Sequence, residues 1–248
     1  MRSFNFIFTF IFTFIFISCG EKKKENITTK KTNIKIRKDV EISNLNYFST
    51  FNGAKEEGES EEYFGAFVND RFDSPKKALF LDGISDYGKI YNVKELNSGK
   101  HISISIWYKP DSYRGNGNNI ILSKSNTTIT QYALSSIGSL YPKTPGTFKL
   151  SFSIEGTLNT IKTKPDVWQP DNWYLLTGTY DGTKMNLYVN GKLLAGRKVV
   201  GTLDVYDFNL FIGKTPTKEY YTSGSFDDLK IFNKALSKKE IMSLYQNR

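Results

Sequence analysis

Runs in which apolar and polar residues alternate recur along residues 44–248, and they constrain the fold more than any other feature of this chain. In residues 101–107 three isoleucines alternate with serines, and residues 150–154 repeat this order. Alternation with a period of two is typical of a strand that buries one face. Asn190-Gly191 lies between two apolar runs and predicts a hairpin turn, because both turn positions need a positive φ. The pattern predicts an all-β fold of two antiparallel sheets packed as a sandwich.

One short helix is expected at the C-terminal end. Ser237 and Glu240 have the spacing of a capping box, in which each residue bonds the backbone N–H of the other. Ile241, Leu244 and Tyr245 follow at steps that place them on one face. We expect this face to pack onto the sandwich.

The composition excludes several classes of protein. Hydrophobic residues make up 39% of the 248 residues and aromatic residues 15%, which excludes disorder of the whole chain. The single cysteine excludes an intrachain disulfide, and with the single histidine it leaves no Cys/His set for a zinc site. That histidine, His101, is interpreted as a polar residue at the edge of a strand.

The first 18 residues have the character of an export signal. Residues 4–17 form an apolar run that is shorter than the ~20 residues needed to cross a membrane. Ile17-Ser18-Cys19-Gly20 resembles a bacterial lipobox, which implies cleavage before Cys19 and lipidation of its thiol. An ordinary secretory signal is the alternative. We expect residues 1–18 to be a lipoprotein signal peptide, and Cys19 to anchor the exported chain to the bacterial cell envelope, at the outer membrane or the cell surface.

Residues 19–43 are expected to form a basic tether. From residue 21 to residue 43 the chain holds eight Lys or Arg and four Asp or Glu, out of a formal net charge of +9 for the whole chain. Such a segment can lie against anionic headgroups, but a solvated spacer is the interpretation we favour. The basic residues of 44–248 are not clustered with aromatic residues, so no nucleic-acid partner is expected.

Six short motifs occur in an order and spacing that one known family shares. They are Tyr47-Phe48-Ser49-Thr50-Phe51-Asn52-Gly53-Ala54, Ala78-Leu79-Phe80-Leu81-Asp82-Gly83, Ile104-Ser105-Ile106-Trp107-Tyr108-Lys109-Pro110, Gly178-Thr179-Tyr180-Asp181-Gly182, Leu187-Tyr188-Val189-Asn190-Gly191 and Phe226-Asp227-Asp228-Leu229-Lys230-Ile231-Phe232-Asn233. Together they resemble a laminin G-like domain of the concanavalin A-like lectin/glucanase superfamily, and the resemblance extends over roughly residues 44–248. The resemblance implies a jelly-roll sandwich, which agrees with the strand pattern.

The resemblance also implies one structural calcium ion near Asp227 and Asp228. Related domains hold this ion with an aspartate and backbone carbonyls; Asp227 matches that aspartate, and Asp82 with the Gly83 carbonyl is its companion. Adjacent strand residues face opposite sides, so we expect one of the two carboxylates to point inward or across the sheet edge and the other to meet solvent. A buried carboxylate is costly without a partner. The alternative partner is a set of backbone N–H groups from a neighbouring loop.

No catalytic acid pair is found. Glucanases of the superfamily use two acids on one strand, in a Glu-x-Asp-x-(x)-Glu pattern, and the chain contains no such run. Its densest acidic cluster, residues 56–62, contains a glycine and no apolar alternation. We interpret this cluster as a solvated loop and expect a protein that is not an enzyme.

Aromatic residues in turn-rich loops are the candidate ligand contacts. Trp168 lies between Pro165 and Pro170, where no strand would hide its ring, whereas Trp107 and Trp173 belong to strand motifs and are expected in the core. Aromatic faces stack on the CH faces of sugars while Asn and Arg bond the hydroxyl groups. The other candidates are Tyr113, Arg114, Asn116, Tyr141, Tyr220 and Tyr221. The alternative is that these rings only pin loops onto the sandwich.

We therefore expect an exported, membrane-anchored and non-catalytic module that recognises an extracellular glycan or another surface protein. A protein–protein adhesion module is one alternative, and it would show an exposed apolar or strand-edge patch. A glycoside hydrolase is the other, and it would need two carboxylates that converge in space.

Overall fold

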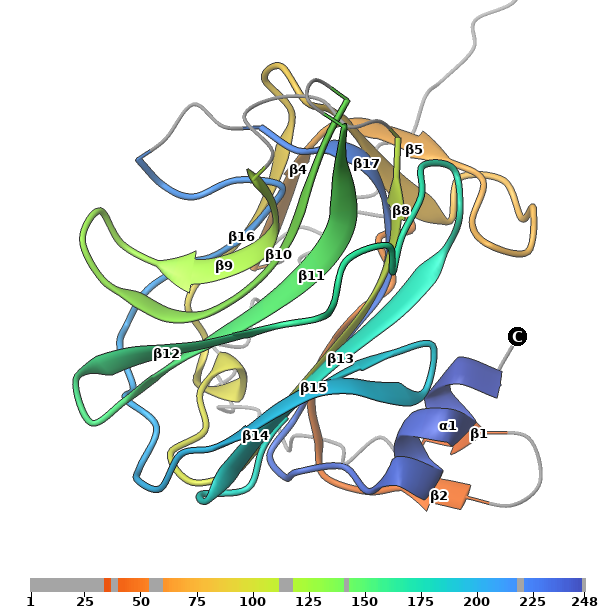
Figure 1. The fold of residues 1–248 in the computed structure, drawn as a ribbon. Coiled ribbons are helices and arrows are strands. Elements are labelled where there is room, and N and C mark those ends of the chain that lie inside the picture. The colour runs from red at the N-terminus through yellow and green to blue at the C-terminus, as the bar shows by residue number, and fades with distance from the viewer. Residues whose placement is uncertain are drawn as a thin grey trace, which may run out of the picture. The chain divides into compact units, whose positions relative to one another are not determined.

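Figure 1 shows a computed structural model of the chain, which describes residues 34–36, 40–53, 60–111, 118–140, 143–217 and 221–246. All of them lie in one unit. Most of this unit is strand, arranged in two large antiparallel sheets (Figure 1). The predicted all-β sandwich is therefore confirmed.

The first large sheet has seven strands. In spatial order they are β12 (Thr157–Lys162), β11 (Lys143–Ile154), β10 (Thr130–Leu140), β9 (Asn118–Ser125), β16 (Leu210–Ile212), β7 (Tyr87–Ile90) and β4 (Glu61–Phe64). Strands β9 to β12 follow one another along the chain, whereas β16, β7 and β4 come from distant segments. This crossing between sheets is what a jelly roll requires.

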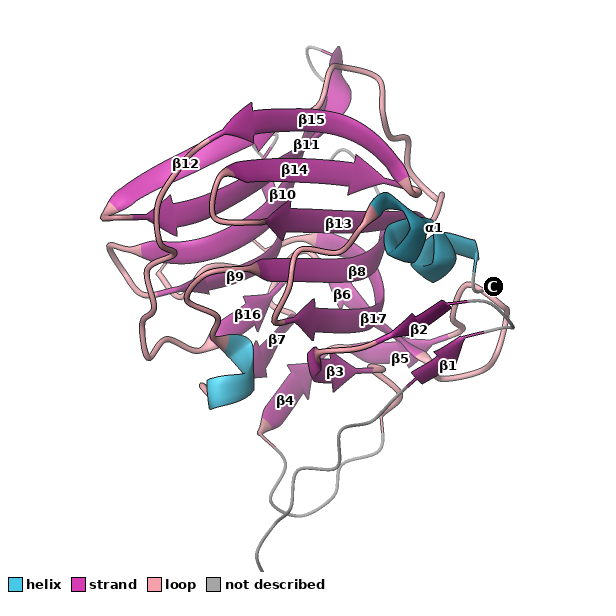
Figure 2. Cartoon of the chain, turned by 90° about the horizontal axis from the view of Figure 1, so that it is seen from below, coloured by secondary structure: helices cyan, strands magenta, loops and turns pink. Residues whose placement is uncertain are grey.

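The second large sheet has eight strands and carries the residues discussed below. In spatial order they are β15 (Lys192–Lys198), β14 (Lys184–Val189), β13 (Tyr174–Tyr180), β8 (Ile102–Pro110), β17 (Ser223–Phe232), β6 (Ala78–Asp82) and β5 (Ala66–Val68), while β3 (Leu45–Ser49) also pairs with β17. Figure 2 shows β15, β14, β13, β8 and β17 side by side in this order. Strand β8 therefore lies near the middle of this sheet.

The core lies between the two sheets, as the alternation predicts. Ile102, Ile104 and Ile106 of β8 are at most 1% exposed and belong to the main hydrophobic cluster. Leu150 and Phe152 of β11 meet them from the other sheet. The outer face of β8 consequently carries the residues between the isoleucines, and it ends with a tryptophan and a lysine.

The predicted hairpin and helix are both confirmed. Asn190 and Gly191 have φ values of 49° and 78°, and they join β14 to β15. Helix α1 (Lys238–Gln246) begins with a capping box, in which Ser237 Oγ accepts from the Glu240 N–H at 3.3 Å and Glu240 Oε2 accepts from the Ser237 N–H at 2.8 Å. The helix packs on the outer face of the eight-stranded sheet, where Leu236, Ile241 and Leu244 surround Trp107, and it covers part of this face (Figure 2).

A short hairpin, β1 (Ile34–Ile36) and β2 (Val40–Ile42), falls inside the segment expected to be the tether. One further short helix, η1 (Lys94–Leu96), connects β7 to β8. None of the described helices is long and apolar enough to span a membrane. The predicted boundaries at residues 18 and 43 stay predictions.

Candidate ligand-binding site

The outer face of the eight-stranded sheet carries a network of buried charges. Arg71, in the loop between β5 and β6, donates hydrogen bonds to Asp227 and Asp228 of β17, and its Nη2 lies 2.9 Å from Asp228 Oδ2. Lys230 Nζ lies 2.9 Å from the same oxygen. The side chains of Arg71 and Asp227 are only 10% and 5% exposed. The network therefore holds the loop against the sheet with little screening by water.

A β-bulge brings both carboxylates to the same guanidinium. The pairing of β17 with β8 shifts register between Asp227 and Lys230, and Asp228 has a φ of 47°. A bulge inserts one extra residue and re-aims the side chains beside it. One carboxylate was expected to point inward or across the sheet edge and the other to meet solvent, but both accept from Arg71. The expectation that they face opposite sides is therefore wrong, because it assumed a regular strand.

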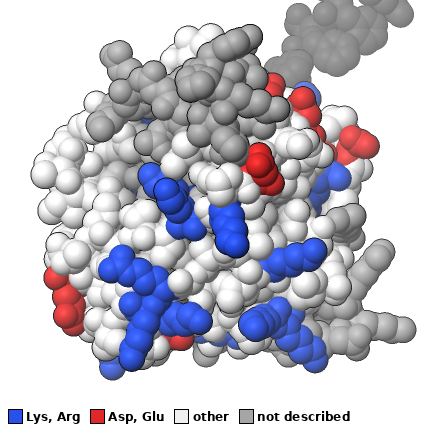
Figure 3. All heavy atoms as spheres, viewed as in Figure 1, with Lys and Arg blue, Asp and Glu red and all other residues white. Residues whose placement is uncertain are grey.

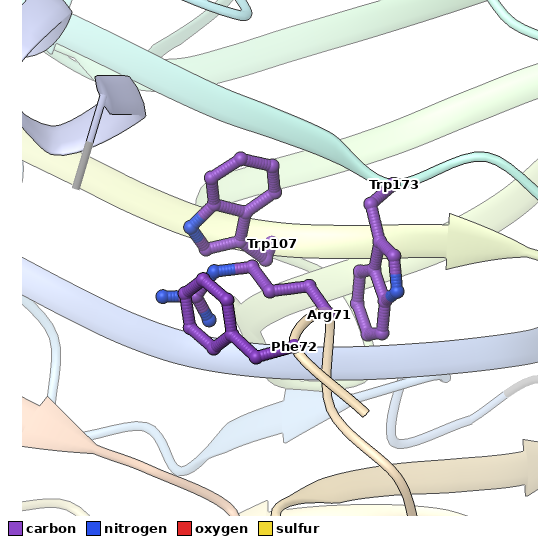
Figure 4. A pocket seen from close by; sticks show the side chains of 4 residues that line it. All are labelled: Arg71, Phe72, Trp107 and Trp173. Atoms are coloured by element: carbon purple, nitrogen blue, oxygen red, sulfur yellow. The ribbon is translucent and has the colours of Figure 1, made fainter. Parts of the chain in front are cut away.

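Beside this network lies a hollow of about 210 Å³, which we call the aromatic slot. It is lined by Arg71, Phe72, Trp107 and Trp173 (Figure 4). The guanidinium carbon of Arg71 lies 4.3 Å from the ring centre of Phe72 and 4.9 Å from that of Trp107. Trp107 is 4% exposed and Phe72 is 45% exposed. The slot thus has a buried floor and an exposed rim, and Arg71 fixes both through cation–π contacts.

Trp173 forms the opposite wall of the aromatic slot. It directly precedes β13, and its ring stands across from Phe72 in Figure 4. Lys109, at the end of β8, places its Nζ 5.7 Å from the centre of the Trp173 ring. The ion pairs among the described residues do not include Lys109. An ammonium group is therefore available to a ligand that stacks on Trp173.

The network changes its charge near neutral pH. Burial raises the pKa of Asp227 to about 7, and the negative charge of Asp228 raises this pKa further, while Arg71 opposes both effects. A neutral Asp227 leaves Arg71 and Lys230 facing the single charge of Asp228. The floor beneath the slot therefore becomes more positive as the pH falls through about 7.

Trp168, the first candidate ligand contact, is in the core. It is 1% exposed, its Nε1 donates to the Thr147 carbonyl at 3.1 Å, and its ring lies 6.2 Å from that of Phe148. Gly146 makes this possible, because a Cβ there would lie 2.8 Å from two atoms of the indole ring. The expectation of an exposed ring is wrong, because the proline-bracketed loop folds back onto β11.

Trp107 and Trp173 were both expected in the core, and this is confirmed for Trp107 but not for Trp173. Trp107 is buried on the outer face, in the second hydrophobic cluster with α1, and its ring stacks at 5.9 Å on Tyr245. Trp173 is partly exposed. Sequence reasoning did not identify Arg71 or Phe72, because a single Arg-Phe pair in a loop carries no motif.

The predicted calcium ligands do not come together. Asp82 pairs with Ser223 of β17, which is four residues, or about 13 Å, along the strand from Asp227. Asp82 Oδ1 accepts from the N–H groups of Ile84, Ser85 and Asp86 at 2.8 to 3.1 Å, and these bonds lower the pKa of Asp82. Asp227 is held by Arg71.

Asp227, Asp82 and the Gly83 carbonyl beside Asp82 therefore do not fit one calcium ion. Across the described parts of the chain, no group of three or more His, Cys, Asp or Glu side chains is placed to hold a metal. Calcium binding stays a prediction.

Most of the other candidate residues lie outside the described residues. They are Cys19, Tyr113, Arg114, Asn116, Tyr141 and Tyr220. Tyr221 is described, and it lies away from the aromatic slot. Lys214 Nζ lies 4.8 Å from the Tyr221 ring centre and 4.5 Å from that of Tyr87, so Tyr221 belongs to a separate cation–π cluster.

A family model described as the concanavalin A-like lectin/glucanases superfamily, of the laminin G type, matches residues 82–242 of the chain. Of the residues that line the aromatic slot, the match includes Trp107 and Trp173, whereas Arg71 and Phe72 precede it. The search among curated proteins finds no match.

Three solved structures illustrate the likeness in fold. The binding domain of Paraclostridial Mosquitocidal Protein 1 has a TM-score of 0.60 and 14% identity, over 75% of this chain and 47% of that one. The binding domain of botulinum neurotoxin serotype G has a TM-score of 0.62 and 15% identity, over 82% and 50%. Domain 4 of AbnA, a GH43 extracellular arabinanase from Geobacillus stearothermophilus solved in complex with arabinotriose, has a TM-score of 0.60 and 15% identity, over 82% and 98%.

At these identities the likeness shows the fold alone. This chain spans about half the length of the two toxin domains, and nearly the full length of the arabinanase domain.

Proposed function

The chain belongs to the concanavalin A-like lectin/glucanase superfamily, and from this membership we propose that residues 44–248 form a non-catalytic module that binds carbohydrate. The observation that carries the proposal is the aromatic slot, with the partly exposed Trp173 on one side and Phe72 on the other. The arabinanase domain that was solved with arabinotriose supports a carbohydrate rather than another ligand class.

The chemistry of the slot suits the end of a glycan chain. A pyranose or furanose ring has an apolar CH face that stacks on an aromatic ring, and hydroxyl groups that need hydrogen-bond partners. Trp173 and Phe72 offer the rings, and Lys109 offers a donor next to Trp173. A hollow of about 210 Å³ is below the roughly 300–1,000 Å³ of pockets for drug-sized ligands. We therefore expect one terminal sugar to enter it.

The acids beside the slot are poorly arranged for hydrolysis. A glycosidase needs one carboxyl group that donates a proton and a second that attacks or activates water, each free to face the glycosidic bond. Asp227 is 3% exposed, and Asp227 and Asp228 both accept hydrogen bonds from Arg71. Their roles as partners of Arg71 support a binding module over an enzyme.

The proposal includes export and a lipid anchor at Cys19. A lipid-modified cysteine would hold the module at the bacterial envelope, where extracellular glycans and surface proteins are its possible ligands. Mass spectrometry of the mature N-terminal peptide tests this part, because a diacylglyceryl group adds a defined mass to Cys19. An unmodified Cys19 in a cleaved chain would contradict the lipid anchor and favour the alternative, an ordinary secretory signal.

The binding experiment is a titration of the full chain with a panel of polysaccharides, followed by Trp fluorescence. We expect Trp173→Ala to weaken the binding of the responding glycan about tenfold, the equivalent of ~1.4 kcal/mol. Phe64→Ala is the control, because Phe64 is an aromatic ring that is 47% exposed and lies outside the slot.

Equal loss in both variants would place the ligand elsewhere. No response to any glycan, with capture of an envelope protein that Trp173→Ala abolishes, would favour a protein-adhesion module. The toxin domains, which are named as binding domains, keep this second function open to the test.

A further inference from the structure

The edge strand β15 and its flanks carry basic and aliphatic side chains without any acid. From Thr183 to Leu203 the chain contains four Lys or Arg residues and no Asp or Glu. Every residue of β15 except Ala195 is exposed. Leu193 and Leu194 are 41% and 40% exposed, and Val200 is 65% exposed.

The edge of the other sheet adds to this surface. Strand β12 lies beside β14 and β15, and it contributes an exposed lysine and Leu158, which is 52% exposed. Figure 3 shows Lys and Arg side chains across the face that β12, β14 and β15 present in Figure 1, with few Asp or Glu among them. We call this surface the basic edge; it comprises Leu158, Lys162, Lys164, Lys184, Lys192, Leu193, Leu194, Arg197, Lys198 and Val200.

The charges of the basic edge are not neutralised within the described residues. The ion pairs found there include none of its six cations. Two acids that flank this surface in the sequence bond backbone N–H groups, since Glu155 Oε1 accepts from the Thr202 N–H at 3.3 Å and Asp181 Oδ1 accepts from the Lys184 N–H at 2.7 Å. Among the described residues, the six cations are therefore without an ion-pair partner and can face an anionic surface.

We propose that the basic edge docks onto a membrane surface rich in anionic phospholipid headgroups. Positive charge alone would suit any polyanion, but a hydrated polysaccharide buries much less of the aliphatic side chains among the cations than a lipid surface does. A lipid surface offers both phosphate groups and a boundary in which Leu and Val side chains are buried. The docking uses strands other than those of the aromatic slot, and it relies on the proposed anchor only to keep a membrane near.

Lysines on an edge strand also have a structural role, and the test must distinguish that role from membrane docking. Charge on an exposed edge prevents two sheets from pairing edge to edge. Glutamate would serve that purpose as well as lysine or arginine, whereas it would repel an anionic membrane. Charge reversal therefore distinguishes the two roles.

The experiment is co-sedimentation of the full chain with vesicles of phosphatidylglycerol and phosphatidylcholine, compared with vesicles of phosphatidylcholine alone. Arg197→Glu with Lys198→Glu is the test variant, and Lys238→Glu with Lys239→Glu, two exposed neighbours on α1, is the matched control. Each basic residue near an anionic surface contributes about fivefold, so the loss of two cations alone weakens partitioning about thirtyfold. We expect at least this loss for the test pair, because the two glutamates also repel the surface, and no more than a small change for the control. Circular dichroism checks that each variant is folded.

A second measurement is independent of the signal segment and the basic tether, which can bind vesicles by themselves. An environment-sensitive dye at Leu194→Cys, in a Cys19→Ser chain, should shift to the blue on the anionic vesicles only. The same dye at Ile84→Cys, a site that is 69% exposed, should not shift.

Equal partitioning of the test and control variants, or no shift at position 194, would overturn the proposal. Binding to a soluble acidic polysaccharide that is as strong as binding to the vesicles, and that the test pair abolishes, would overturn it in favour of a glycan partner. None of these results would affect the proposal that the aromatic slot binds carbohydrate, because Trp173→Ala tests that proposal separately.

Discussion

Removal of the Trp168 indole is the most direct test of our assignment of Trp168 to the core and Trp173 to the aromatic slot. Trp168 is 1% exposed and fills the space between Gly146, Phe148 and the loop that contains it. Trp168→Ala would leave a cavity of nearly the whole ring and would remove the hydrogen bond from Nε1 to the Thr147 carbonyl. We predict a large loss of stability with no direct effect on ligand contacts.

The magnitude follows from burial. Truncation of a fully buried tryptophan costs about 3–5 kcal/mol, and a carbonyl left without its donor adds about 1 kcal/mol. The total of about 4–6 kcal/mol is a large part of the roughly 5–15 kcal/mol that stabilises a domain. Trp173→Ala removes a partly exposed ring and should cost less than about 1.5 kcal/mol.

Urea denaturation measures both values. The midpoint should fall strongly for Trp168→Ala and slightly for Trp173→Ala, while m stays unchanged for both. Gly146→Ala is a second probe, because its methyl group would lie 2.6 Å from the Trp168 carbonyl oxygen and should cost about 1–3 kcal/mol by overpacking. A Trp168→Ala protein that is as stable as the native chain and fails to bind glycan would refute the reasoning.

Three further predictions concern the charges and the ion. Arg71→Met should cost about 3–5 kcal/mol in urea at pH 8, because it leaves the Asp227 carboxylate buried without a partner; a loss below 1 kcal/mol would contradict this. The pKa of Asp227 is raised from 3.8 to about 7, so the folded state binds this proton more tightly than the unfolded state, and the stability it contributes is full below pH 3.8 and is lost as the pH rises through about 7. Denaturation at several pH values should show this fall in the native chain, and Asp227→Asn should remove it. The calcium prediction requires that EDTA lowers Tm and that added Ca²⁺ restores it; an unchanged Tm would remove the ion.

The sequence was sufficient for the strands, the hairpin and the helix because each depends on neighbours along the chain. The isoleucines of β8 alternate with serines, Asn190-Gly191 needs two positive φ values, and Ser237 with Glu240 closes a capping box. These requirements are local, so the residues that meet them lie close together in the sequence and can be recognised there. The same holds for the order of family motifs, which fixed the sandwich.

The sequence could not predict the charge network, because the residues that form it are far apart along the chain. Arg71 and Asp227 are 156 residues apart in the chain, and nothing near Arg71 marks it as a partner. The free-energy cost of burying the Asp227 carboxylate did predict that it needs a charged or hydrogen-bonding partner, but it did not identify which residue that partner is. The bulge at Asp228 is a further non-local event, since it depends on how β17 pairs with β8.

Trp168 is buried where exposure was expected and Trp173 is partly exposed where burial was expected, and this difference has a general physical cause. A period of two separates the two faces of a strand, but it does not say whether the outer face meets water, a helix or a loop. On β8 the outer face meets all three, because α1 covers Trp107 from one side and the Arg71 loop does so from another, and the part left between them is open. A loop, by contrast, must satisfy its own backbone, and a glycine in the adjacent strand is enough to let a large ring fold inward, as Gly146 does for Trp168. In a sandwich with a helix on one outer face, an aromatic residue on that face is therefore a better ligand candidate than one between two prolines.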